Sequence, residues 1–188
     1  MVLMFDSRWF RRLRVAATAA IASATALTGC SAPTVPTDGK PVIVASMYPF
    51  AYLASAIAGD AADVVTLVPP GTEPHDYELT PSQRGLLSQA TLVVYQQGIN
   101  AAVDTAIAQA APAHVVETGS LVTLLRAADD GADTSGEPHG DYIFDPHTWL
   151  DPRNMVAFAE ALSAAMAEAD PAHAADYKIG RASCRERV

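Results

Sequence analysis

The chain has 188 residues, which is enough for one domain or slightly more. Its formal net charge is −9 at neutral pH, and residues 30–178, with five basic and nineteen acidic side chains, carry a net charge of −14. A surface this acidic repels phosphate groups, so the composition excludes nucleic acid as a partner.

The N-terminal segment has the profile of a bacterial export signal. Four arginines among the first 14 residues precede an uncharged run at 15–27, which is shorter than the roughly 20 apolar residues that span a bilayer. The run ends in Leu27-Thr28-Gly29-Cys30, which resembles a lipobox, in which the cysteine accepts a lipid. We therefore expect residues 1–29 to be a signal peptide and Cys30 to be the lipid attachment site. Residues 30–40, rich in Ser, Thr and Pro, are then a flexible tether, which argues against Cys30 as an ordinary buried cysteine.

Strands and helices are predicted to alternate along residues 41–177. Short apolar, β-branched runs predict strands at 42–46, 63–68, 91–95 and 114–117. Apolar residues at helical spacing behind a proline or a capping residue predict helices from Pro49, from Pro81 with Thr80 as its N-cap, over 100–110, and from Pro152. This alternation predicts an α/β fold with a mainly parallel sheet flanked by helices. Ligands of such sheets bind beyond the carboxyl ends of the strands.

Two loops at strand or helix ends each carry one histidine. His75 lies in residues 68–81, after the second strand, and His147 lies in residues 145–152, before the last helix. Each follows a proline, and such stiff loops suit a metal site, because ligands must be held in place before the ion arrives. Neutral imidazole binds Zn²⁺ and other transition metals, and carboxylates often orient it through its second nitrogen. The candidates for that orienting role are Asp76, Asp145 and Asp151. A lone loop histidine is more often an ordinary surface residue, so the shared strand-end position is what favours a site.

The chain resembles the cluster A-I solute-binding proteins of ABC importers for zinc and manganese. The resemblance covers residues 42–178 and rests on Ser46-Met47-Tyr48-Pro49-Phe50, on Glu73-Pro74-His75-Asp76, and on Asp145-Pro146-His147-Thr148-Trp149-Leu150-Asp151-Pro152. It implies that residues 41–177 form the N-terminal metal-binding lobe of a two-lobe protein and that His75 and His147 are metal ligands. A third and a fourth ligand would come from a C-terminal lobe that lies largely outside this chain.

The same resemblance implies a function in metal transport without catalytic residues. The ligand would be a divalent transition metal ion, with Zn²⁺ favoured over Mn²⁺, and the partner would be an ABC permease subunit. The protein would be a monomer, lipid-anchored to the outer face of the bacterial cytoplasmic membrane. Because two histidines cannot close a tetrahedral zinc site, we expect weak zinc binding by residues 30–178. The affinity should also fall as the pH drops through the imidazole range, near 6.5 for an unperturbed group.

Two other functions use some of the same features. A metal-dependent hydrolase would combine the two histidines with a carboxylate base, for which Glu73 is the candidate. A cell-surface adhesin or interaction lipoprotein would need neither histidine. The remaining histidines, which are His114, His139 and His173, are interpreted as surface residues.

The last eleven residues, 178–188, are rich in arginine and interrupt the helical pattern before them. They resemble the in-frame translation of a sequencing adapter. We therefore expect that residues 178–188 are an artefact and that the natural protein continues differently from Lys178.

Overall fold

The computed structural model describes residues 39–126 and 144–185 and has a four-stranded parallel sheet at its centre. In sequence the strands are β1 (Val42–Ala45), β2 (Asp63–Thr66), β3 (Leu92–Tyr95) and β4 (Val115–Glu117). Across the sheet their order is β2-β1-β3-β4. Each predicted strand is present, shortened by one or two residues, and the predicted α/β class with a parallel sheet is confirmed.

Both faces of the sheet are buried. Val44 of β1 lies opposite Val65 of β2 and Val93 of β3, which sets the register of the central strands. Because side chains alternate along a strand, Ile43 and Ala45 join one hydrophobic cluster while Val42 and Val44 join the other. This double burial explains why the strands read as continuous apolar runs in the sequence.

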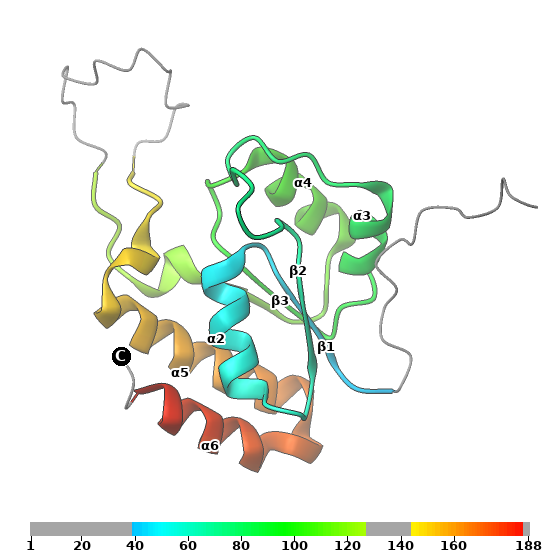
Figure 1. Cartoon of the computed structure of the whole chain (residues 1–188), viewed down its shortest axis with the longest axis vertical. Helices are drawn as coiled ribbons and strands as arrows, with labels where there is room; N and C mark the ends of the chain where they lie inside the picture. The colour runs from blue at the N-terminus through cyan, green and yellow to red at the C-terminus, as the bar shows by residue number, and fades with distance from the viewer. Residues whose placement is uncertain (1–38, 127–143, 186–188) are drawn as a thin grey trace, which may run out of the picture. The chain divides into compact units, whose positions relative to one another are not determined.

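Helices cover the two faces of the sheet separately (Figure 1). One face carries α2 (Tyr48–Ala58), α5 (Pro152–Ala169) and α6 (Ala174–Arg185), and the other carries α3 (Pro81–Leu87) and α4 (Ala101–Ala110). The predicted N-cap of α3 is confirmed, because Gln83 N donates to Thr80 Oγ1 at 3.3 Å and Thr80 N donates to Gln83 Oε1 at 2.9 Å. This reciprocal pair is a capping box.

The last helix, α6, packs on α2 and was not predicted from the sequence. Its Tyr177 is 1% exposed, and at Gly180 a Cβ atom would lie 2.2 Å from the carbonyl oxygen of Ile57 in α2. The side chain at this position therefore has to be absent for the two helices to approach so closely. The helix runs through residues 178–185, and the foreign origin of residues 178–188 stays a prediction.

The segment that ends at Arg126 lies beside the segment that begins at Phe144. Arg126 and Phe144 form an antiparallel bridge, and Asp145 N donates to Leu125 O at 2.8 Å. The acidic segment with His139 that separates these residues lies outside the described part of the chain. So do the predicted signal peptide, Cys30 and most of the tether. Within the described part, no helix combines the length and the apolar character needed to cross a membrane.

Candidate metal centre

The two histidine loops meet at the carboxyl edge of the sheet. In the sheet, β2 lies on one side of β1 and β3 lies on the other. The direction in which successive strands are added therefore changes between β1 and β3. A switch of this kind leaves a crevice beyond the strand ends, where ligands of parallel sheets bind. The loop between β2 and α3 and the segment between β3 and α4 both begin at this edge.

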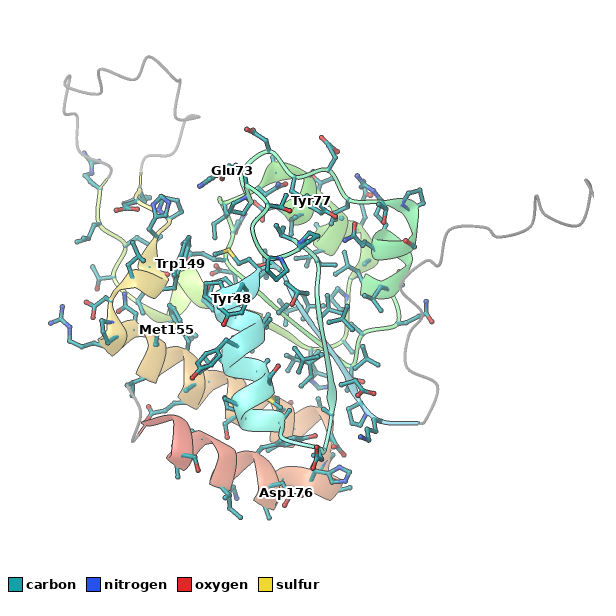
Figure 2. All side chains as sticks on the ribbon, in the orientation of Figure 1. Tyr48, Glu73, Tyr77, Trp149, Met155 and Asp176 are labelled. Atoms are coloured by element: carbon teal, nitrogen blue, oxygen red, sulfur yellow. The ribbon has the colours of Figure 1, made fainter. Side chains whose placement is uncertain are left out.

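His75 lies half-buried in the loop between β2 and α3, the loop that also carries Glu73 and Tyr77 (Figure 2). Its ring Nδ1 donates to the carbonyl oxygen of Ile99 at 3.0 Å, and its main-chain N–H donates to Glu73 Oε1 at 3.2 Å. A carbonyl oxygen can only accept, so this contact requires the proton on Nδ1 and leaves the lone pair of a neutral ring on Nε2.

His147 lies immediately before the short 3₁₀ helix η3 (Thr148–Leu150), which leads into α5. The Oδ1 atom of Asp145 accepts both from His147 N at 2.9 Å and from His147 Nδ1 at 2.8 Å. The hydrogen bond from the main chain and then that from the ring hold the pKa of Asp145 below its usual value. As at His75, the acceptor on Nδ1 places the lone pair of the neutral imidazole on Nε2.

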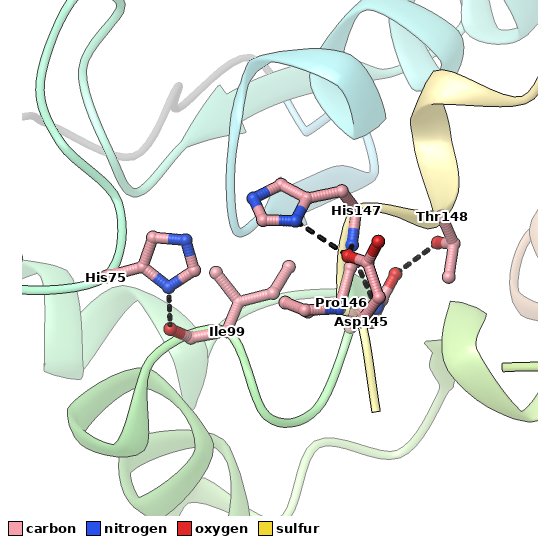
Figure 3. Close-up of polar contacts among 7 residues, drawn as sticks. His75, Ile99, Asp145, Pro146, His147 and Thr148 are labelled. Carbon is pink, nitrogen blue, oxygen red and sulfur yellow. Dashed lines mark hydrogen bonds and ion pairs between the residues drawn. The ribbon is translucent and has the colours of Figure 1, made fainter. Parts of the chain in front are cut away.

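The two imidazoles, 72 residues apart in the sequence, lie next to each other (Figure 3). Their ring centroids are 5.7 Å apart and their planes make an angle of 61°. Two imidazoles that bind one tetrahedral zinc ion at about 2.0–2.1 Å have centroids roughly 5 Å apart. The spacing therefore fits a shared metal ion. The Trp149 ring also packs against His147, with their ring centroids 5.2 Å apart.

The three predicted orienting carboxylates differ in their placement. Asp145 contacts the His147 ring, as described above. The Asp151 carboxylate instead accepts from Arg153 N at 2.9 Å at the start of α5 and forms an ion pair with Arg153 Nη2 at 2.6 Å. Asp76 is exposed, and the ring hydrogen bond of the neighbouring His75 goes to Ile99.

The Ile99 carbonyl is one contact at this site that sequence reasoning missed. Every residue has a main-chain carbonyl, so residue type gives no signal for it. Its position was informative, because Ile99 lies just beyond the carboxyl end of β3, at the same edge as the two loops. Within residues 39–126 and 144–185, no group of three His, Cys, Asp or Glu side chains is placed to hold a metal ion.

Two other predicted surface histidines lie in the described ranges. His173 is partly exposed beside α6, where its Nδ1 donates to Asp170 Oδ2 at 2.6 Å. His114 is half-buried, just before β4. Each of these two rings belongs to a different part of the fold from the His75–His147 pair.

Comparison with known proteins gives consistent matches. The family model described as zinc-uptake complex component A, periplasmic (ZnuA), matches residues 43–188. The zinc-binding lipoprotein AdcA of Streptococcus pneumoniae serotype 4 is 30% identical over 129 residues, which are 65% of this chain and 26% of the relative. The iron-binding protein YfeA of Yersinia pestis is 29% identical over 147 residues, covering 72% of this chain and 42% of the relative.

The fold has solved counterparts of the same kind. The Zn(II)-bound ZnuA-like domain of Streptococcus pneumoniae AdcA matches with a TM-score of 0.65 at 25% identity, over 79% of this chain and 52% of that one. The chain therefore spans between about a quarter and about a half of the proteins that it matches.

Proposed function

Because this chain belongs to the family of periplasmic zinc-uptake component A proteins, we propose that it captures a divalent transition metal for import. Zn²⁺ is the first candidate ion and Mn²⁺ the second. The captured ion would then pass to an ABC-type permease in the same membrane. The family is one of uptake components and not of enzymes, so we assign no catalytic residue.

The observation that carries the proposal is the meeting of His75 and His147. Both rings donate from Nδ1 to an oxygen acceptor, so both present Nε2 as the metal-binding atom of a neutral imidazole. Their centroid separation of 5.7 Å is close to that of two ligands on one ion. Two nitrogen ligands occupy half of a tetrahedral site. We expect water, or ligands from a second lobe such as the part of the relatives that this chain does not span, to fill the other positions.

The chemistry of this pair suits a carrier. Imidazole binds borderline metals firmly but releases them on protonation or ligand exchange, whereas a site of four thiolates would hold zinc too tightly for delivery. The Glu73 carboxylate accepts a hydrogen bond from the main chain of His75, which supports a role in shaping the loop over a role as a base for hydrolysis.

The proposed location follows from the N-terminal segment. Cys30 and the signal peptide lie outside the described residues, and the lipidation of Cys30 is part of the proposal. A lipid on Cys30 would hold a monomer at the outer face of the cytoplasmic membrane, within reach of the permease. Membrane attachment of this kind needs more than one acyl chain to be stable.

Zinc titration of the full chain and of single histidine variants tests the proposal. His75→Ala and His147→Ala should each weaken one-to-one zinc binding by at least about tenfold, since each removes one of two protein ligands. Competition with a chromophoric chelator measures this affinity, which we expect to be weak even in the unaltered chain.

His114→Ala is the matched control, because it removes one imidazole from another part of the fold. Its zinc affinity should equal that of the unaltered chain. A similar loss in all three variants would mean that zinc binds to imidazoles without a defined site and would contradict the proposal.

A further inference from the structure

The segment from Gln96 to Asn100, between β3 and α4, is held rigidly at the edge of the sheet. Gln97 N donates to Glu117 Oε1 at 3.0 Å, and Gly98 N donates to Asp104 Oδ2 at 2.9 Å. Gly98 has φ 89°, a left-handed conformation that favours glycine. Neighbouring elements therefore fix this short segment from both sides, through β4 and α4.

Asn100 joins this segment to the His75 loop. Its side chain is buried, and its Oδ1 accepts from the N–H groups of Ala102 and Val103 as the N-cap of α4. This capping contact fixes the amide orientation and turns Nδ2 away from the helix. Nδ2 then donates to Pro74 O at 2.7 Å and to Tyr77 O at 2.9 Å, so one amide bonds the loop on both sides of His75.

Gln96 makes the corresponding contact with the His147 loop. It is 3% exposed, and its Oε1 accepts from the hydroxyl groups of Thr118 and Thr148. The carbonyl oxygen of Pro146 can only accept, so the amide atom that faces it is the donor Nε2, and Oε1 is turned toward the hydroxyls. The Thr148 and Pro146 contacts bracket His147, and Figure 3 shows Pro146 and Thr148 on either side of it.

We propose that Gln96 and Asn100 are positioning residues for the metal centre. Each buried amide holds the carbonyl of the proline that precedes a ligand histidine, and the two amides are four residues apart on one rigid segment. Together with the Ile99 carbonyl, which orients the His75 ring, they set the separation and the mutual angle of the two imidazoles. The role as metal ligands rests on the proposed function, whereas the positioning of the rings stands on these contacts alone.

Two isosteric substitutions remove the donors and keep the acceptors. Asn100→Asp retains an oxygen to cap α4 but places a second oxygen against the carbonyls of Pro74 and Tyr77. Gln96→Glu retains the acceptor for the two threonines but loses the donor to Pro146. Each should weaken zinc binding by about 10–100-fold, the usual effect of losing a contact that orients a ligand.

Two readouts separate positioning from stability. The nuclear Overhauser effect between the ring protons of His75 and His147, recorded without metal, reports the ring separation directly, and zinc titration reports its consequence. Ser163→Ala is the control, because it removes a buried hydrogen bond from Ser163 Oγ to Tyr177 O between α5 and α6. We expect Ser163→Ala to lower the thermal midpoint while keeping the ring–ring signal and the zinc affinity of the unaltered chain.

The proposal predicts two results for both isosteric variants. They lose the ring–ring signal, and they bind zinc at least about tenfold more weakly than Ser163→Ala when their thermal midpoints are similar. The proposal is overturned if they keep the signal, or if their loss follows the thermal midpoint alone. Should they not fold, Asn100→Ser, which still caps a helix but is too short to reach Pro74, and Gln96→Met take their place. If the unaltered chain binds no zinc, the proposed function fails, and the ring–ring signal still decides whether the amides position the rings.

Discussion

His75 and His147 are oriented by acceptors of two different kinds. His147 uses the Asp145 carboxylate two residues before it, whereas His75 uses the Ile99 carbonyl 24 residues after it. The Asp145–His147 contact is local and forms whenever the loop at residues 145–147 adopts its turn. The Ile99–His75 contact exists only when the segment after β3 and the loop after β2 lie side by side. The ring contact of His75 therefore depends on the whole sheet. The ring contact of His147 is local, although the loop that carries it is held across the fold by Gln96.

A pair of substitutions at Asp145 tests the local contact. Asp145→Ala removes the acceptor for His147 Nδ1 and should weaken zinc binding by about 10–100-fold. Asp145→Asn keeps a side-chain oxygen at the same position and should lose much less. Zinc affinities from chelator competition decide between these outcomes. Equal affinities for the two variants would show that the acceptor on Nδ1 does not matter for the ligand.

At the scale of the elements, apolar periodicity identified every strand of the described sheet and the helices α2, α3, α4 and α5. Residues such as Thr80 carried a local signal, because a capping box depends on residues three apart. Asn100, which the predicted helix 100–110 included, is instead the N-cap of α4. Its capping oxygen is a local feature, while its amide donors reach Pro74 and Tyr77 more than 20 residues away. Contacts with main-chain carbonyls across the fold leave no trace in residue spacing.

The packing of α6 on α2 gives a prediction at this scale. Gly180→Ala should lower the free energy of unfolding by about 1–3 kcal/mol, because a Cβ at 2.2 Å from Ile57 O forces the helices apart. Urea unfolding measures this change.

Gly85 in α3 is the matched control, because a Cβ there meets nothing within 4 Å. Gly85→Ala should raise the free energy of unfolding by about 0.5–1 kcal/mol through helix propensity alone. If Gly180→Ala were stabilising to the same degree, α6 would not pack on α2 in solution as described.

The whole molecule is acidic, and its carboxylates couple folding to pH. Hydrogen bonds from His147 lower the pKa of Asp145, and those from Arg153 lower the pKa of Asp151. Burial acts to raise the pKa of Asp170, but hydrogen bonds from Tyr177 and His173 outweigh it, so this pKa is lowered as well. Asp104 is the opposite case, because burial raises its pKa despite the hydrogen bond from Gly98.

These shifts predict that the fold weakens in acid. A lowered pKa contributes stability above the unfolded value, about 3.9 for Asp, and this stability is lost as the pH falls through the folded value. The free energy of unfolding in urea should therefore be smaller at about pH 3 than at about pH 7. Asp104 contributes in the other direction, with stability that is present in acid and lost as the pH rises. Asp104→Asn should therefore enlarge the difference, and a stability independent of pH would contradict the assignment.

The pairing of Arg126 with Phe144 has a consequence for how this chain can vary. It ties the two ends of an acidic stretch together just before Asp145, so the path of the chain into His147 is set at the base of that stretch. Lengthening a closed loop is inexpensive, since each doubling adds only about 0.6 kcal/mol of closure entropy. Evolution can therefore insert, delete or recompose residues between these two positions while His147 keeps its place.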